Sequence, residues 1–290
     1  MEETISRMSI SLFGWAAEKV QGKFAFVKTG LDQSDMRFLL KVWISISMFA
    51  GVMTFLASSA FFIILSLFMN FDLVTQVMLA FLSAAIGIGT FGLTCMYPYE
   101  RASSRRRSID VNLPFALNHI SAISASGVPP YVMFKLITGF GEYGEIAKES
   151  QKIVRNVDLF GLSITEAIIE IAARTPSKKF KELLEGIHSN IETGGDLKQF
   201  LKIQAQDALF DYRIKREKYI ELLSTYADFY TALLIAAPLF LVAILAVMNM
   251  MGGAIGGIAI NDIMNLGILI GLPVVNIAFI IFVNATQPEV

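Results

Sequence analysis

Four long stretches of the chain carry no charged side chain, and they come in two pairs. They cover residues 42–69, 73–99, 229–261 and 263–287. A helix that crosses a bilayer needs about 20 consecutive apolar residues, and each stretch is longer than that. The pattern predicts an all-α membrane protein whose four transmembrane helices form two hairpins. The charged segment between the hairpins predicts a helical bundle outside the bilayer.

Composition agrees with a membrane protein. The 290 residues are 54% hydrophobic and only 17% charged, whereas a soluble domain has about a quarter of its residues charged. The net charge of −1 gives no bulk attraction to nucleic acid, so no nucleic-acid partner is expected. Cys95 is the single cysteine, which excludes an internal disulfide and a cysteine-based zinc site.

The distribution of lysine and arginine predicts how the chain crosses the membrane. Neither hairpin turn, residues 70–72 and 252–262, contains a lysine or arginine. The flanking segments on the other side are rich in them, at Lys19, Lys23, Lys28, Arg37, Lys41, Arg101, Arg105, Arg106, Arg107, Arg213, Lys215, Arg216 and Lys218. Because positive segments stay in the cytoplasm, we expect a multi-pass protein of the cell membrane with both termini cytoplasmic.

Four segments follow from these patterns. They are an amphipathic cytoplasmic segment at 1–41, a transmembrane hairpin at 42–98, a cytoplasmic domain at 99–225 and a second hairpin at 226–287. The first segment mixes aromatic residues with lysines, as is typical of a helix at the membrane interface.

Punctuation within the central domain predicts a compact bundle of about six helices. Asp110 is expected to cap a helix that stops before Gly127, and a later helix runs from about Gly144 to Gly161. Ser163 with Glu166 three residues on forms the sequence of a capping box.

Two further helices complete the predicted bundle. Thr175 followed by Pro176 predicts the start of one helix, and Gly194-Gly195 predicts its end. Asp196 is expected to open a long helix that continues into the third span, where Pro238 introduces a kink, as Pro273 does in the fourth span.

Several motifs favour structural roles over chemistry. The GxGxxG pattern at 87–92 lies inside a span, where small residues allow close helix packing. Glu185, His188 and Glu192 share one helix face, but a di-iron site needs a second Glu-x-x-His motif. The sequence has no GxxxxGK[ST] phosphate loop, and no catalytic, cofactor or metal site is predicted.

Two basic clusters are candidates for binding a partner. Lys178, Lys179 and Lys181 lie in the first turns of a predicted helix, where positive charge opposes the helix dipole. Arg105, Arg106 and Arg107 lie close to the membrane, where anionic lipid and topology are the alternative explanation. Either cluster could dock an acidic surface.

An ordered set of motifs resembles the type II secretion F-domain family. It begins with residues 113–117 and 126–130 and continues through residues at Gly127, Glu149, Gly161, Gly194, Gly195, Asp196 and Pro238. The segments at 97–102 and 174–177 are most similar to the archaeal branch, the platform proteins of archaella and archaeal type IV pili. Tad-type pilus platform proteins are similar in size and layout.

The resemblance implies an assembly platform without an active site. Such platforms work beside a hexameric cytoplasmic ATPase and help to move pilin-like subunits from the bilayer into a filament. Many relatives carry two helical domains or a longer membrane region. The resemblance therefore leaves open a homodimer, pairing with a second platform protein, or a piece of a longer one. A polytopic transporter or channel with a helical cytoplasmic domain is the alternative function, although the spans lack charged residues.

Overall fold

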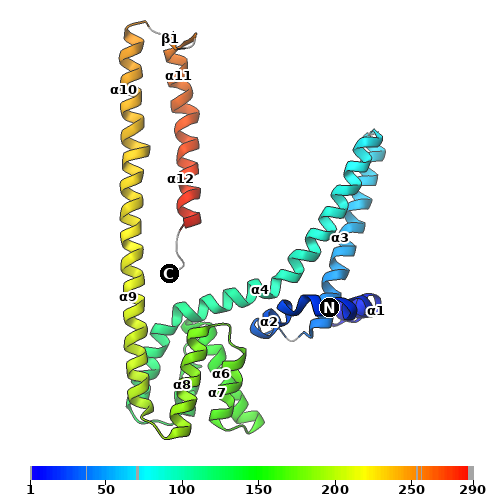
Figure 1. Cartoon of the computed structure of the whole chain (residues 1–290), viewed down its shortest axis with the longest axis vertical. Helices are drawn as coiled ribbons and strands as arrows, with labels where there is room; N and C mark the ends of the chain where they lie inside the picture. The colour runs from blue at the N-terminus through cyan, green and yellow to red at the C-terminus, as the bar shows by residue number, and fades with distance from the viewer. Residues whose placement is uncertain (1, 37, 70–71, 253, 256, 287–290) are drawn as a thin grey trace. The chain divides into compact units, whose positions relative to one another are not determined.

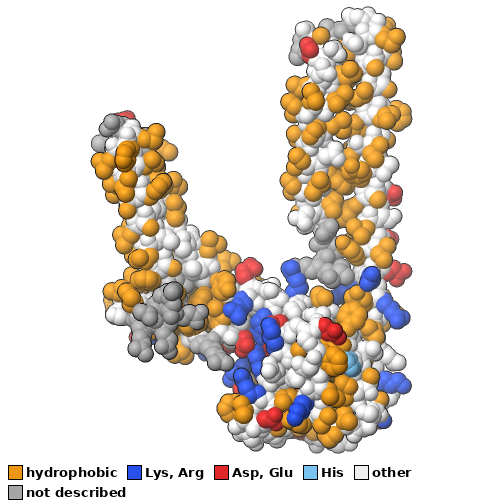
Figure 2. Space-filling view, turned by 180° about the vertical axis from the view of Figure 1, so that it is seen from behind, with side chains coloured by type: hydrophobic (Ala, Val, Ile, Leu, Met, Phe, Trp, Pro, Cys, Tyr) orange, Lys and Arg blue, Asp and Glu red, His pale blue; other side chains and the backbone are white. Residues whose placement is uncertain are grey.

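The chain is almost entirely helical. The computed structural model describes residues 2–36, 38–69, 72–252, 254–255 and 257–286. Four helices in these ranges are long and apolar enough to cross a membrane, at Leu40–Met69, Val74–Ala125, Leu197–Met250 and Ile260–Thr286. Figure 1 shows them as two helical hairpins, and Figure 2 shows hydrophobic side chains over the outer surface of both. The prediction of an all-α protein with four membrane-length helices is confirmed.

The chain divides into two compact units, residues Met1–Gln206 and Asp207–Val290. The helices of the first unit are α1 (Glu2–Val20), α2 (Ala25–Gln33), α3 (Leu40–Met69), α4 (Leu73–Ala125), α5 (Pro130–Ile137), α6 (Glu145–Phe160), α7 (Ile164–Arg174), α8 (Lys178–Thr193) and the start of α9 (Leu197–Tyr230), with short 3-10 turns at Gln21–Phe24 and Gly141–Tyr143. Two of the predicted domain boundaries, between residues 98 and 99 and between residues 225 and 226, fall inside the continuous helices α4 and α9. The structure marks no break at either position, and the boundaries stay predictions.

Helix α4 corrects one expectation. Asp110 does not cap a new helix, because α4 continues without interruption from the first hairpin to Ala125. The segment contains Pro98 and Pro114, yet it stays helical. Proline removes the N–H that would bond the carbonyl four residues earlier, which for Pro98 is that of Thr94. The indole Nε1 of Trp43 donates to this Thr94 carbonyl at 3.1 Å, so a side chain from α3 satisfies the orphaned group.

The N-terminal segment packs against the first hairpin. Val27 and Leu31 of α2 form a small core with Trp43, and Lys41 pairs with Glu18 of α1 at 2.6 Å between Nζ and Oε2. The Trp15 ring on the outer side of α1 is 79% exposed, with the Lys19 ammonium 5.9 Å from the ring centre. An exposed tryptophan beside a lysine suits the predicted position at a membrane interface.

Close packing of α3 on α4 explains part of the GxGxxG pattern. A Cβ atom at Gly87 would lie 2.8 Å from the Cβ of Phe55 and 3.0 Å from the carbonyl oxygen of Gly51. Only glycine allows this approach. Gly89 and Gly92 have open space around them, so the packing interpretation is confirmed for Gly87 alone.

The helix ends of the central bundle follow the expected punctuation at several points. Gly161 ends α6 in the left-handed conformation, with φ of 66°. The Ser163–Glu166 capping box opens α7, with both reciprocal hydrogen bonds formed. Gly194 ends α8 with φ of 66°, again a conformation that glycine adopts without strain. These three predictions are confirmed.

The start of α8 differs from the prediction. Thr175 ends α7, and the N-cap of α8 is Ser177, whose hydroxyl accepts from the Phe180 N–H at 3.1 Å. Asp196 does cap α9, because its Oδ1 accepts from the N–H of Gln199 at 3.0 Å. Helix α9 packs on α8 where Phe200 meets Gly186.

The second unit is a helical hairpin that begins within α9. Its elements are the remainder of α9, a π-helical turn at Thr231–Ala236, α10 (Ala237–Met250), a two-stranded antiparallel ribbon of β1 (Ala254–Ile255) and β2 (Ile258–Ala259), α11 (Ile260–Leu266), a π-helical turn at Gly267–Gly271 and α12 (Leu272–Thr286). Each π turn directly precedes a proline-containing helix start, at Pro238 and Pro273. Widening the helix before proline accommodates its ring and its missing N–H.

Candidate functional site

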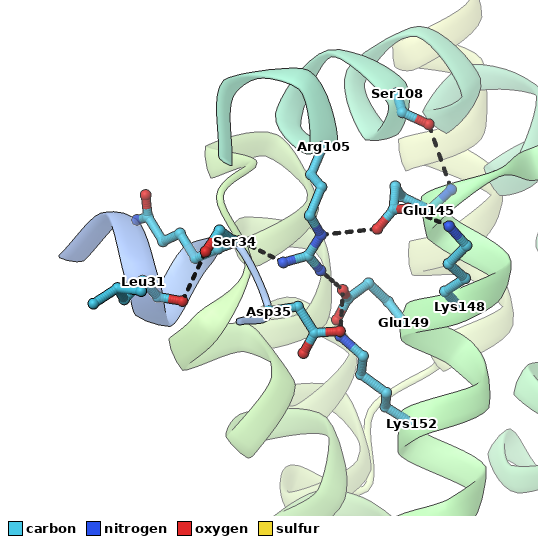
Figure 3. Close-up of polar contacts among 10 residues, drawn as sticks. Leu31, Ser34, Asp35, Arg105, Ser108, Glu145, Lys148, Glu149 and Lys152 are labelled. Carbon is cyan, nitrogen blue, oxygen red and sulfur yellow. Dashed lines mark hydrogen bonds and ion pairs between the residues drawn. The ribbon is translucent and has the colours of Figure 1, made fainter. Parts of the chain in front are cut away.

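A buried ion-pair network joins three helical segments of the first unit. Figure 3 shows Arg105 of α4 reaching between α6 and the end of α2. Its Nε donates to Glu145 Oε2 at 2.8 Å, its Nη2 donates to Glu149, and its Nη1 donates to the backbone carbonyl of Gln33. The side chains of Arg105 and Glu149 are 9% and 3% exposed. One guanidinium therefore connects α4, α6 and the N-terminal segment.

Two lysines of α6 complete the network. Lys148 Nζ lies 2.7 Å from Glu145 Oε1. Lys152 Nζ lies 3.2 Å from Glu149 Oε1 and 2.7 Å from Oδ2 of Asp35, just after α2. Three cations thus face three carboxylates. A buried charge is tolerated only when it is paired and hydrogen-bonded, and this network meets both conditions.

The network also sets the titration of its partly exposed acids. Burial alone would raise the pKa of Glu145, but hydrogen bonds and attraction from Lys148 and Arg105 outweigh it and lower the pKa. Burial likewise acts to raise the pKa of Asp35, and Lys152, with Arg105 and Arg155 nearby, lowers it overall. Both carboxylates are therefore held in their charged form.

Arg105 must be removed from the candidate docking residues. Docking requires an exposed side chain, whereas Arg105 is buried and fully engaged. No local sequence pattern predicts the burial of Arg105, because its partners lie 40 and 44 residues further along the chain. Glu149, one of the family-motif residues, is the acid that meets it.

A contact through Asp110 links the remaining basic residues of α4 to the start of α8. Arg106 Nε pairs with Asp110 Oδ2 at 3.4 Å, and Oδ1 of the same Asp110 accepts a hydrogen bond from the Ser177 hydroxyl. Ser177 immediately precedes Lys178, so this contact brings the arginines of α4 next to the first turns of α8. We call this the basic surface. It comprises Arg106, Arg107, Lys178, Lys179 and Lys181, all exposed or, for Lys181, about half exposed.

Weak ion pairs accompany two of the lysines. Lys178 lies 3.8 Å from Glu182, and Lys181 lies 3.8 Å from Glu185, each pair four residues apart along α8. These two lysines therefore make a small contribution to the stability of α8. Exposed pairs of this kind contribute about 0.3–0.5 kcal/mol, and lysine before glutamate is the less favourable order. The ammonium groups remain accessible to a stronger partner.

The other family-motif residues shape turns and helix ends. Gly127 follows α4 with φ of 76°. Gly195 donates its N–H to the Asn190 carbonyl at 2.8 Å, which closes the turn between α8 and α9. The described residues contain no group of three or more His, Cys, Asp or Glu side chains placed to hold a metal. On the Glu185–His188–Glu192 face, His188 Nε2 lies 3.4 Å from Glu192.

Comparison with known families gives one match, to the middle of the chain. The chain is an all-α protein with two membrane-length hairpins and a central helical domain, and its residues 116–245 match the family described as type II secretion system (T2SS), protein F. This match confirms the resemblance seen in the sequence.

Three curated relatives are archaeal. The chain is 29% identical over 147 residues to an uncharacterized protein of Methanocaldococcus jannaschii, covering 51% of the chain and 25% of the relative. It is 29% identical over 147 residues to the flagella accessory protein J of the same organism, covering 50% of the chain and 26% of the relative. It is 25% identical over 184 residues to the flagella accessory protein J of Methanococcus voltae, covering 63% of the chain and 32% of the relative. The chain spans only a quarter to a third of these relatives' length. No solved structure matches it.

Proposed function

We propose that the chain is a cell-membrane assembly platform of a type IV pilus-like or archaellum-like machine. The observation that carries the proposal is the match of residues 116–245 to the protein F family, in a helical domain flanked by two membrane-length hairpins. In this role a cytoplasmic secretion ATPase acts on the central domain, and pilin-like subunits leave the bilayer beside the spans. The platform acts as a homodimer or with a second platform protein.

The proposal assigns the energy source to a partner. Helix α9 begins in the central domain and continues, through the π turn and α10, to Met250 in the third span. A continuous helix of this kind provides a physical route for movement between a cytoplasmic motor and the spans. The transporter alternative needs a polar pathway through the membrane. The 490 Å³ groove among α1, α3 and α4 favours the platform over a transporter, because its lining is apolar, with Phe13, Met48, Val52, Phe55, Ile88 and Phe91 among the residues.

The basic surface is the proposed ATPase contact. Complementary charge steers encounter and fixes the register of a complex. Replacing Lys178, Lys179 and Lys181 with glutamate should weaken binding of the purified cognate secretion ATPase to the full chain in nanodiscs, and should abolish filament assembly. Salt should reduce wild-type binding as well, because exposed charges are screened beyond about 8–10 Å.

A matched control makes this test specific. Lys135, Lys198 and Lys202 are also exposed on the central domain, so their replacement by glutamate gives the same change in net charge elsewhere. This control should bind the ATPase and assemble filaments. Equal loss in both triple variants, or normal binding in the first, would exclude the basic surface as the contact.

The orientation is tested separately. We expect single cysteines at Asp72 and Asp262, beside the two hairpin turns, to react with a membrane-impermeant thiol reagent on intact cells in a Cys95→Ala background. A cysteine at exposed Glu142 should not react until the cells are opened. Labelling of Glu142→Cys alone on intact cells would reverse the proposed topology.

A further inference from the structure

The membrane-proximal half of α9 carries a continuous face of aromatic and basic side chains. Residues three and four apart lie on one side of a helix, and Arg216, Tyr219, Leu223, Tyr226 and Tyr230 follow this spacing. The opposite side of the same segment carries Asp207, Glu217 and Glu221. The segment is therefore amphipathic, with its acids directed away from the aromatic face.

The upper end of this face is already a helix–helix contact. The Tyr226 ring lies 6.2 Å from that of Phe282, and the Tyr230 ring lies 5.5 Å from that of Phe279. The Tyr230 hydroxyl also donates to Oδ1 of Asn276 at 3.4 Å. Helix α12 thus occupies the face at Tyr226 and Tyr230. Figure 1 shows that the two helices run antiparallel.

The face continues beyond the contact with α12. Helix α12 ends at Thr286, four residues after Phe282. Helix α9 begins at Leu197, so it continues for more than two turns on the N-terminal side of Tyr226. Along that extension Leu223 is 38% exposed, and the adjacent Leu222 and Ile220 are 40% and 58% exposed. Arg216 Nη1 donates to the Tyr212 hydroxyl at 3.1 Å, which lays the guanidinium along the helix.

We propose that this extension binds an acidic amphipathic helix of another protein, stacked end to end with α12 on the same face of α9. We call the site the α9 seam and define it as Arg213, Lys215, Arg216, Tyr219 and Leu223. The aromatic and leucine side chains supply the apolar contact of a helix-in-groove interface. The three cations supply charge complementarity to an acidic helix. The inference does not depend on which machine the chain serves.

Charge disfavours a second copy of this chain as the occupant. In a paired helix whose core positions are Arg216, Tyr219 and Leu223, Arg213 and Lys215 take the flanking positions that face the partner. A parallel pair with these core positions places Arg216 against Arg216 of the second copy. Like charges at such positions are unfavourable, so a partner with glutamate or aspartate there fits better.

Distance disfavours lipid headgroups as the occupant. The uncharged stretch of the third span begins at Phe229, thirteen residues after Arg216. At 1.5 Å per residue this separation is about 20 Å along the helix. The headgroup region of one leaflet is only about 5–8 Å thick, so Arg216 lies beyond it. A protein partner can reach this depth of the cytoplasm.

Photo-crosslinking in the cells that produce the protein tests the α9 seam. A benzophenone amino acid at Tyr219 should form an adduct with another protein, and the crosslinked peptide should be a helix-forming segment with acidic residues three and four apart. The same probe at exposed Glu221, on the opposite side of α9, should not form that adduct. Replacing Arg213, Lys215 and Arg216 with glutamate should lower the adduct yield about tenfold.

Charge exchange distinguishes a specific seam from general attraction. Reversing the acids of the captured helix to lysine should restore the adduct with the Arg213→Glu, Lys215→Glu, Arg216→Glu variant, and a single Lys218→Glu change should leave the wild-type yield unchanged. The proposal is overturned by an adduct only to lipid, to a second copy, or to residues 287–290 of the same chain. It is equally overturned by no adduct, or by the same adduct from Glu221.

Discussion

Arg105 should be far more important for stability than its neighbour Arg106. Arg105→Met removes a guanidinium that is 9% exposed. Among the described residues, it leaves Lys152 as the remaining cationic partner of Glu149, which is 3% exposed. Removing one member of a buried ion pair costs about 3–5 kcal/mol, because it leaves an uncompensated buried charge. Two lysines remain in the network, so we expect the lower end, about 3 kcal/mol.

Arg106→Met is the matched control. The Arg106 side chain is 61% exposed and makes one ion pair, 3.4 Å from Asp110. An exposed pair of this kind contributes at most about 1 kcal/mol. The stability loss in Arg105→Lys should fall between those of the two methionine variants. Lysine keeps the positive charge, but its single ammonium group cannot bond all three acceptors of the planar guanidinium.

Hydrogen–deuterium exchange of the full chain in nanodiscs measures the difference. A loss of about 3 kcal/mol in protection free energy, as expected for Arg105→Met, makes exchange roughly a hundredfold faster. The loss of at most about 1 kcal/mol expected for Arg106→Met makes it about fivefold faster or less. The increase should appear in α6 and also in α2, because Arg105 holds the Gln33 carbonyl and Lys152 holds Asp35. Equal protection in the Arg105→Met and Arg106→Met variants, or a change confined to α4, would refute this account of the network.

Three further outcomes are expected from other contacts. Ser177→Ala removes the N-cap of α8 and the hydrogen bond to Asp110, so α8 should lose about 1–2 kcal/mol of protection, whereas the exposed Ser189→Ala should not destabilise it. Gly186→Ala places a Cβ 2.4 Å from the Phe200 ring and should cost about 1–3 kcal/mol in thermal unfolding, with part recovered by Phe200→Leu. Folding lowers the pKa values of Glu145 and Asp35, so their contribution to stability is present at neutral pH and is lost as pH falls through those lowered values. Exchange protection of α2, corrected for intrinsic exchange rates, should therefore stay constant from about pH 5 to 7 and drop below about pH 4.

Local signals in the sequence predicted much of this architecture. The uncharged stretches give the four membrane-length helices, because bilayer thickness fixes their length. Gly161, Gly194 and the Ser163–Glu166 box mark helix ends through their own backbone and side-chain hydrogen bonds. These features depend on residues within one helical turn, so a sequence pattern is sufficient to find them.

The errors arise where tertiary contacts compete with local signals. Asp110 has the chemistry of an N-cap, but α4 passes through it, and its carboxylate bonds Arg106 and Ser177 instead. Proline usually interrupts a helix, yet α4 continues through Pro98, where Trp43 donates to the Thr94 carbonyl that the proline leaves unpaired. In the sequence, nothing distinguishes Arg105 from Arg106 and Arg107. Arg105 is buried because α6 and the end of α2 pack against it and supply its hydrogen-bond acceptors.

Deletion of the chain in its own organism tests the central claim most directly. Electron microscopy of the cell surface would be combined with immunoblots of the secretion ATPase and of processed pilin-like subunits. The account predicts that one class of surface filament disappears while its subunits accumulate in the membrane and the ATPase is still made, and that the full chain supplied in trans restores the filaments. Unchanged filaments of every class in the deletion strain would contradict the assignment as an assembly platform.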